Sequence, residues 1–276
     1  MPLEKTEAIV LKSFNWSESS RTVVFFSRDR GKIALVDKGG RRFKSKRGRL
    51  TPFALLELTF YSSEKESRGY ISDIHLVETF SFESDGTVGR LAFGSAACEL
   101  LQVLLPEEEP QENLFNYFAS YLRNIETFHK RSLPGLFLAF FLRLLSQLGY
   151  HPSLAYCASC GRDVDSVRSH LETDEDEKAT SLSFSVDFFP ERGGLLCPAC
   201  QTTADYYIPL SVDDMKYLLE LQNASLKEAA TVPIGYRNAM RLIEALTRFL
   251  GFQTGLKMNL KSLEFLDKLK NTRLSE

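Results

Sequence analysis

The sequence predicts an α+β multidomain protein, in which an N-terminal β-barrel precedes a helical bundle domain with an inserted four-cysteine module. The first 80 residues contain five short runs typical of strands, and from about residue 86 the apolar residues recur at helical spacing. Two Cys-x-x-Cys pairs then interrupt the helical part. We expect three domains, with the barrel at 1–80, the helical domain at 81–152 and 205–276, and the inserted module at 153–204.

The barrel is predicted from runs rich in β-branched and aromatic residues: EAIVLKSF, RTVVFFSR, GKIALVDK, ALLELTFYS and GYISDIHLV. Turn-forming segments such as Asp29-Arg30-Gly31 and Gly39-Gly40 separate them. Five strands in this length fit a small barrel, and we favour the OB-fold, although an SH3-like barrel satisfies the same strand count. Most aromatic side chains here are expected in the barrel core, and Trp16, in a polar turn, is the one expected to be exposed.

Helices are predicted on both sides of the cysteine module. The first stripe, after residue 86, includes Cys98, which we expect to be a small buried hydrophobe. A second helix is expected from Glu112 to about Lys130, and a nearly all-apolar central helix starts at Pro134 and ends at Gly149. Three more follow the module, in MKYLLELQ, IGYRNAMRLIEALTRFLG and NLKSLEFLDKLK. Ser211, with Asp214 three residues on, resembles a capping box ahead of the first of these.

The cysteine pairs indicate a metal site. Each Cys-x-x-Cys turns two thiolates toward one centre, and two such hooks complete a tetrahedral set that suits Zn²⁺. A redox pair or two local disulfides are the alternatives, but the matching second pair favours metal. A complete set of four cysteines needs neither His151 nor His170. We predict one structural Zn²⁺ per chain, and its ligands are Cys157, Cys160, Cys197 and Cys200.

Composition bounds the class of protein. The longest apolar run, Leu133 to Leu142, has 10 residues, whereas a bilayer span needs about 20. The first residues contain no signal sequence, and paired cysteines favour a reducing compartment, so we expect a cytoplasmic protein without a membrane partner. The charge is unevenly divided, with a net of +5 in residues 1–80 and −7 in the remainder. This division suggests an anionic partner for the N-terminal part.

A basic segment, residues 38–49, follows the third predicted strand. Seven of its twelve residues are Lys or Arg and none is acidic. A solvated loop is the simplest interpretation of such a run, but the absence of acids, the Gly-Gly pair and Phe43, which could stack on a base, favour nucleic-acid binding. The predicted DNA-contacting residues are Lys38, Arg41, Arg42, Lys44, Lys46, Arg47 and Arg49.

No catalytic motif is visible in the sequence. The phosphate-binding motifs G-x-x-x-x-G-K-[ST] and G-x-G-x-x-G, the G-x-S-x-G nucleophile elbow and the H-E-x-x-H zinc motif are all absent, and the four histidines are scattered. We therefore expect a binding protein and not an enzyme.

The order of these parts resembles the RecO recombination-mediator family, of the zinc-bearing type. The similarity rests on Glu18-Ser19, Ser27 to Lys32, Lys38 to Arg42, Pro52-Phe53, and on the central helix followed by CASCG and later PERGGLLCPAC. It extends over nearly the whole chain. Ser27 stands where Thr is common in the family, Gly40 is an additional glycine, and the acidic excursion at 172–177 is long.

The resemblance implies a DNA repair and homologous recombination mediator of the RecFOR pathway. Such a protein binds single- and double-stranded DNA, anneals complementary strands and, with RecR, helps to load RecA onto DNA coated by single-strand binding protein. Implied partners are therefore DNA, RecR, the C-terminal tail of single-strand binding protein and, indirectly, RecF and RecA, in the bacterial cytoplasm at the nucleoid. The alternative is a non-catalytic zinc-ribbon and OB-fold scaffold that binds structured RNA or an acidic protein tail.

Overall fold

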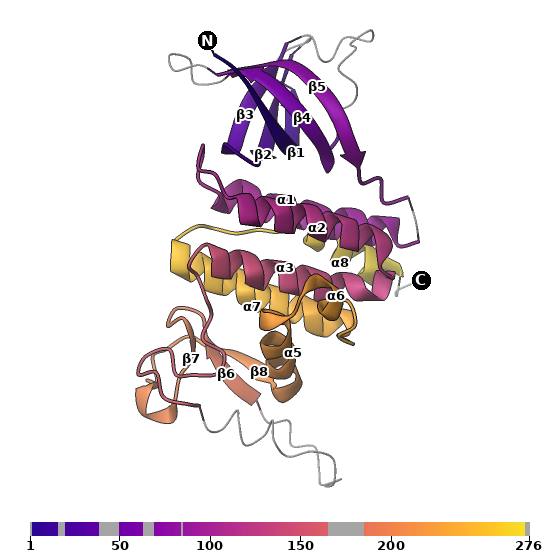
Figure 1. Ribbon diagram of the computed structural model, residues 1–276. Helices are drawn as coiled ribbons and strands as arrows, with labels where there is room; N and C mark the ends of the chain where they lie inside the picture. Colours follow the sequence, from indigo (N-terminus) through magenta and orange to yellow (C-terminus); the bar gives the residue numbers. More distant parts are fainter. Residues whose placement is uncertain are drawn as a thin grey trace. The chain divides into compact units, whose positions relative to one another are not determined.

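The computed structural model of the protein describes residues 2–15, 20–38, 50–62, 69–83, 85–164 and 185–273. They belong to two compact units, one formed by Met1–Lys130 with Leu260–Glu276 and the other by Arg131–Asn259 (Figure 1). The first unit therefore combines the barrel with three helices. The three domains expected from the sequence separate strands, helices and the cysteine module, and do not follow the two compact units. Their boundaries stay a prediction.

The N-terminal strands form a closed five-stranded barrel with the order β1-β2-β3-β5-β4 (Figure 1). Neighbouring strands are antiparallel except β3 and β5, which pair in parallel, and β1 closes the barrel by pairing with β4 as well as β2. This is the OB-fold predicted from the strand count. The strands are β1 (Leu3–Asn15), β2 (Arg21–Ser27), β3 (Gly31–Asp37), β4 (Ala54–Tyr61) and β5 (Gly69–Thr79).

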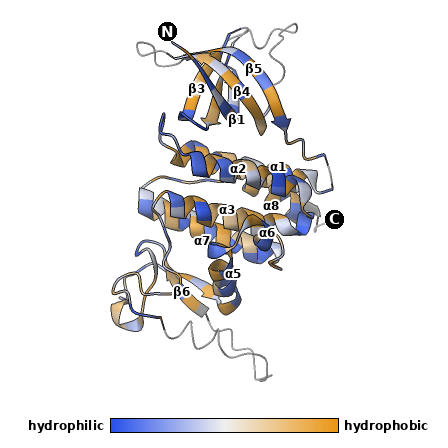
Figure 2. Cartoon of the chain, viewed as in Figure 1, coloured by the Kyte–Doolittle hydropathy of each residue, from blue (hydrophilic) through white to orange (hydrophobic). Residues whose placement is uncertain are grey.

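Apolar side chains at alternate positions of the strands fill the interior of the barrel. Val23 and Phe25 of β2, and Ile33 and Leu35 of β3, point into one buried apolar cluster, while the residues between them face outward. Leu50, just after the basic segment, belongs to the same cluster. In Figure 2 the barrel strands accordingly carry both hydrophobic and hydrophilic bands.

Three helices complete the first unit: α1 (Thr87–Leu104), α2 (Glu112–Thr127) and α8 (Lys261–Arg273). Phe26 projects from the outer face of β2 onto α2, with ring centroids 5.5 Å from Phe115 and 6.5 Å from Phe118. Cys98 lies in α1 and is buried, as predicted, and burial raises the pKa of its thiol. The predicted second helix ends at Thr127, three residues before the expected end.

The second unit is built around α3 (Leu133–Gln147), which is packed by α5 (Val212–Asn223), α6 (Leu226–Ala229) and α7 (Tyr236–Thr254). Twelve residues of α3 are buried, so the prediction of an apolar central helix is confirmed. Pro134 lies in its first turn, as expected. Ser211 and Asp214 form the predicted capping box, and Ser225 with Glu228 forms a second one ahead of α6.

The second unit also contains a three-stranded antiparallel sheet with the order β7-β6-β8. Its strands are β6 (Ser185–Phe189), β7 (Gly194–Leu195) and β8 (Ile208–Ser211). Strands β6 and β7 lie between the two cysteine pairs in the sequence. Of the helices that the structure describes, none is sufficiently long and apolar for a membrane span.

Gly31, at the start of β3, allows a close backbone approach between the barrel and the connection of α1 to α2. Its φ is +64°, and a Cβ at this position would lie 2.0 Å from the carbonyl oxygen of Glu109. Next to it, the amide of Glu108 donates to the carbonyl oxygen of Lys32 at 3.0 Å. The glycine is therefore required both by its conformation and by the lack of space.

We expect Gly31→Ala to destabilise the protein by roughly 3 kcal/mol, because the left-handed conformation and the contact with rigid backbone both oppose a side chain. Gly149→Ala is the matched control, since Gly149 has φ +83° but open space around it, and it should cost only about 1 kcal/mol. Urea unfolding of the two variants measures the difference. Equal costs would show that the approach to Glu109 does not constrain the barrel.

Candidate metal centre and nucleic-acid interface

The four cysteines of the two pairs converge on one point. Their sulfur atoms all lie within 4.8 Å of one another, and Cys160 Sγ is 3.7 Å from Cys197 Sγ. A tetrahedron with metal–sulfur bonds of about 2.3 Å has sulfur–sulfur edges of about 3.8 Å. The four thiols are therefore close enough to one another to hold a metal ion.

Backbone hydrogen bonds shape each pair into a hook. In the first hook, the amide of Gly161 donates to the carbonyl oxygen of Cys157 at 2.8 Å. The amide of Cys157 donates to the carbonyl oxygen of Arg162 at 2.7 Å. Gly161 has φ +73°, as expected for the residue after the hook. In the second hook the amide of Cys200 donates to the carbonyl oxygen of Cys197 at 2.9 Å. Tight turns at both pairs thus aim the thiols at the same centre.

The electrostatic environment favours a thiolate at Cys157. Burial opposes ionisation of this thiol, but backbone N–H groups of Cys197, Cys160 and Ser159 point toward it and lower its pKa to about 6. Cys200 behaves in the opposite way, because hydrogen bonds with the thiols of Cys197 and Cys160 raise its pKa to about 12. A metal ion supplies the positive charge that four close thiolates require.

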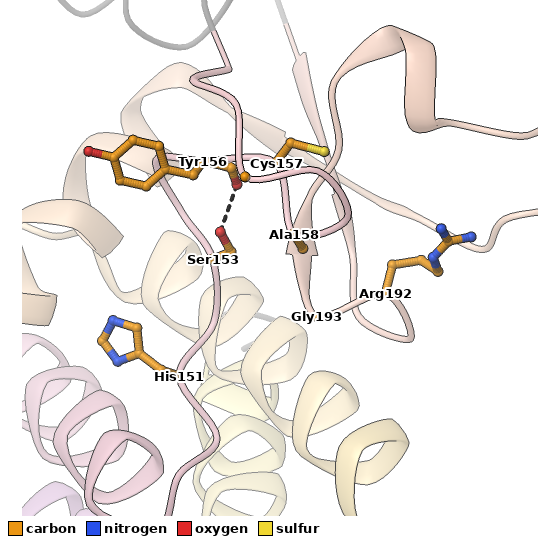
Figure 3. Close-up of a pocket in the computed structure, with 8 residues that line it drawn as sticks. His151, Ser153, Tyr156, Cys157, Ala158, Arg192 and Gly193 are labelled. Atoms are coloured by element: carbon orange, nitrogen blue, oxygen red, sulfur yellow. Dashed lines mark hydrogen bonds between the residues drawn. The ribbon is translucent and has the colours of Figure 1, made fainter.

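The alternatives from the sequence find less support in this geometry. All five cysteines carry free thiols, so neither pair is joined as a disulfide. His151 lines an open depression of about 560 Å³ together with Cys157, yet it lies apart from the sulfur in Figure 3, and its Nε2 is 3.0 Å from Gln222 Nε2. It is not part of the cluster of four. His170 lies outside the described residues.

The basic segment joins β3 to β4. Lys38 is its only described residue, and its ammonium stands over the ring of Tyr70, 3.5 Å from the centroid. The other predicted DNA-contacting residues lie outside the described part of the chain, as do Phe43 and Trp16; they are Arg41, Arg42, Lys44, Lys46, Arg47 and Arg49. What the structure describes is therefore where the segment begins and ends.

The strand register places those ends. Asn15 of β1 pairs with Arg21 of β2, which pairs with Asp37 of β3, so the connections after β1 and β3 leave the same end of the barrel. We call this the loop end. The parallel pairing of Val36 with Tyr70 brings the start of β5 to the loop end as well.

Most other described cations of the barrel are occupied by contacts within the fold. Lys5 pairs with Glu57 and Arg30 with Glu4, while Lys32 Nζ donates to the carbonyl oxygen of Gln102 at 2.8 Å. Arg28 binds Glu7 and Glu112. Lys12, in contrast, is exposed and makes no ion pair with any described residue. The positive excess of residues 1–80 therefore resides mainly in the basic segment.

Some aromatic side chains differ from the expectation that they fill the barrel. Phe25 and Phe60 are core residues and Phe26 is buried against α2, but Phe14 and Tyr61 are 42% and 41% exposed. Phe14 follows a β-bulge between Val10 and Lys12 that shifts the pairing by one residue. No residue pattern in this part of the sequence indicates the bulge, so the outward position of Phe14 was not predicted.

A barrel of this topology, with a basic segment at its loop end and a four-thiol centre in a separate helical unit, defines a DNA-binding protein of the OB-fold class. The comparisons with known proteins agree. Residues 1–80 match the family described as "Recombination protein O N terminal", and residues 86–264 match "Recombination protein O C terminal". The chain belongs to the RecO family.

Similar proteins align along their whole length. DNA repair protein RecO of Symbiobacterium thermophilum is 30% identical over 279 residues, which cover 99% of this chain and 100% of the relative. Proteins of the same name from Anaeromyxobacter dehalogenans and Caldanaerobacter subterraneus are 28% and 29% identical and align over 98% and 97% of this chain. In each of these two cases the alignment covers 98% of the relative. The family assignment made from the sequence is confirmed.

The attachment of the basic segment depends on a buried ion pair. Arg21 Nε donates to Asp37 Oδ2 at 2.9 Å, and the side chains are 14% and 0% exposed. Removing Arg21 takes away the cation beside the buried Asp37 carboxylate, and losing one partner of a buried ion pair is costly. We expect Arg21→Met to lower the free energy of unfolding by about 3 kcal/mol.

Lys5→Met is the matched control, because the Lys5–Glu57 pair is exposed and should contribute no more than about 1 kcal/mol. Urea unfolding of both variants checks the comparison. A cost for Arg21→Met as small as that of Lys5→Met would mean that the buried pair does not hold the loop end together.

Proposed function

We propose that this protein is a non-catalytic recombination mediator, which binds single- and double-stranded DNA and anneals complementary strands. With RecR it helps RecA to replace single-strand binding protein on DNA. The observation that carries the proposal is the attachment of an acid-free basic segment to the loop end of an OB-fold barrel, in a chain of the RecO family.

The physical role of the basic segment is to lower the repulsion between strands. Two DNA strands carry like charge, and a surface that neutralises phosphates on both reduces the cost of bringing them together. The contacts assigned to this role are Lys38, Arg41, Arg42, Lys44, Lys46, Arg47 and Arg49. Because phosphate contacts do not depend on sequence, annealing by this route accepts any complementary pair.

The metal that best fits the four thiols is Zn²⁺, one per chain, held by Cys157, Cys160, Cys197 and Cys200. A closed set of four thiolates leaves no position for a reacting water, so the proposed role is structural. Bound zinc would join the hook of Cys157 and Cys160 to the hook of Cys197 and Cys200, which are separated by 36 residues in the sequence.

Partners follow from the family in this proposal. They are DNA, RecR and the C-terminal tail of single-strand binding protein, with RecF and RecA as indirect partners. Relatives named DNA repair protein RecO support a role in repair. Work on DNA would place the protein at the nucleoid of a bacterial cytoplasm.

The first test removes four cations from the basic segment. We expect a variant with Arg41, Arg42, Lys44 and Arg47 each changed to Ala to bind single-stranded DNA more weakly and to anneal strands more slowly. The slope of log affinity against log salt should flatten by about 0.7 for each lost phosphate contact. Fluorescence anisotropy at several salt concentrations measures the slope.

The matched control removes four exposed cations of the second unit, with Lys216, Lys227, Arg237 and Lys257 changed to Ala. The net charge changes equally, but the slope should stay near that of the unchanged protein. An unaltered slope in the folded segment variant would move the DNA site elsewhere. Competition by structured RNA stronger than by single-stranded DNA would favour the scaffold alternative.

The second test concerns zinc. Protein purified without chelators should contain about one zinc per chain, and Cys197→Ser should lose the metal and melt at a lower temperature, because three thiolates bind zinc less tightly than four. Cys98→Ala, which removes a cysteine outside the cluster, should keep its zinc. Metal analysis and thermal unfolding on the same samples decide. Zinc-free protein of unchanged stability would refute a structural metal.

A further inference from the structure

Backbone hydrogen bonds hold the two cysteine hooks beside each other. The amide of Ser153 donates to the carbonyl oxygen of Gly193 at 3.0 Å, and the amide of Leu195 donates to the carbonyl oxygen of Ser153 at 2.9 Å. Ala158, inside the first hook, donates its amide to the carbonyl oxygen of Leu195 at 2.8 Å. Leu195 lies two residues before Cys197, so this pairing places the first hook beside the start of the second without using a thiol.

One short sulfur–sulfur distance spans the two hooks. Cys160 Sγ, of the first hook, is 3.7 Å from Cys197 Sγ, of the second. A disulfide bond is about 2.0 Å long, so the two sulfur atoms would have to approach by about 1.7 Å. Because the backbone on both sides is already paired, this approach requires side-chain movement more than a rearrangement of the hooks.

Exposure makes Cys160 the thiol that an oxidant in solution reaches first. Cys160 is exposed, whereas Cys157 is buried and both cysteines of the second hook are half-buried. Cys98, the fifth cysteine, lies outside the cluster and is buried in α1, where burial raises the pKa of its thiol. Oxidation follows exposure and thiolate character, so it should begin at Cys160 and spare Cys98.

We propose that Cys160 and Cys197 are an oxidation site, at which hydrogen peroxide produces a reversible disulfide between the two hooks. The thiolate of Cys160 attacks the peroxide, whose O–O bond breaks, and a sulfenic acid and a hydroxide form. The thiolate of Cys197 then attacks the sulfenic sulfur and expels a second hydroxide. Two protons from solvent convert the hydroxides to water, so two thiolates lose two electrons and one peroxide becomes two waters.

The disulfide would replace the metal as the link between the hooks. Only Cys157 and Cys200 would remain as thiolates, whereas a closed structural zinc site uses four ligands, so bound zinc would be released. The bond would still join segments that 36 residues separate in the sequence, which a disulfide within either hook would not do. This consequence rests on the proposed zinc site, but formation of the bond itself does not.

The bond should be transient in a reducing compartment. Thiol–disulfide exchange with a dithiol breaks it and restores both thiols, so the four ligands become available again. The second unit would thus keep its two hooks joined during an oxidative challenge and return to the four-thiol state afterwards.

The test maps the disulfide by peptide analysis. Trypsin cuts after Arg162 and Arg192, so one fragment carries both cysteines of the first hook and another carries both of the second. Full-length protein purified with its zinc is treated with an equimolar amount of hydrogen peroxide, alkylated and digested without reduction. We expect the two fragments to be joined through Cys160 and Cys197, with about one zinc released for each bond. Dithiothreitol with added zinc should reverse both changes.

Thermal unfolding gives a second measurement. Oxidised protein should melt at a higher temperature than reduced protein stripped of metal by a chelator, because the disulfide restricts the unfolded chain. Equal melting temperatures would show that the bond does not take over the link between the hooks.

Two variants are matched, since Cys160→Ser and Cys157→Ser each remove one thiol of the first hook. Under peroxide, Cys157→Ser should still give the joined fragments, whereas Cys160→Ser should lose most of them. Both variants lack one zinc ligand, so weaker metal binding affects them alike. Cys98 should stay unmodified in every sample.

Bonds confined to the single hooks, a sulfinic acid at Cys160 without joined fragments, or equal joining in the two variants would overturn the inference. The proposed zinc site fails separately, because it is wrong if the untreated protein contains no metal. Joined fragments from zinc-free protein would support the disulfide and refute the structural metal. Zinc-loaded protein that gives no joined fragments would refute the disulfide alone.

Discussion

The register of β1, β2 and β3 at the loop end of the barrel is the constraint on which the rest of the proposed nucleic-acid interface depends. Asn15, Arg21 and Asp37 stand in one row, and the buried pair between Arg21 and Asp37 fixes the last of these positions. Because the strands are locked in this register, the connections after β1 and β3 emerge together. The basic segment, the exposed ring of Phe14 and the Lys38–Tyr70 contact are thereby gathered at one end of the barrel.

The four-thiol centre depends on a different kind of constraint, which is local at each hook and long-range between them. Turn hydrogen bonds at Cys157 and Cys197 aim each pair of thiols, and either hook can form from its own few residues. Bringing the two together requires the sheet of β6, β7 and β8, since the amide of Ala158 donates to the carbonyl oxygen of Leu195 at 2.8 Å. A metal at this point would join segments that the chain otherwise leaves far apart in sequence.

Much of this organisation could be predicted from the sequence. Period-two alternation predicted the five barrel strands, and the apolar run from Leu133 predicted the central helix. Ser211 with Asp214 predicted the cap of α5. The pairing of four cysteines predicted the cluster. The β-bulge after Val10 and the pairing of Arg21 with Asp37 could not be predicted, because each depends on which strands become neighbours and in which register.

The sequence by itself determined the types of the elements, the identity of the four clustered cysteines and the concentration of positive charge in residues 38–49, since these follow from local pattern and composition. The tertiary structure alone decided which side chains share a surface. Lys12 and Phe14 are separated from Tyr70 by more than fifty residues, yet strand pairing places them on one face of the barrel. The physical reason is that backbone hydrogen bonds between strands form regardless of the distance between the strands in the sequence, and their register decides which distant residues become neighbours.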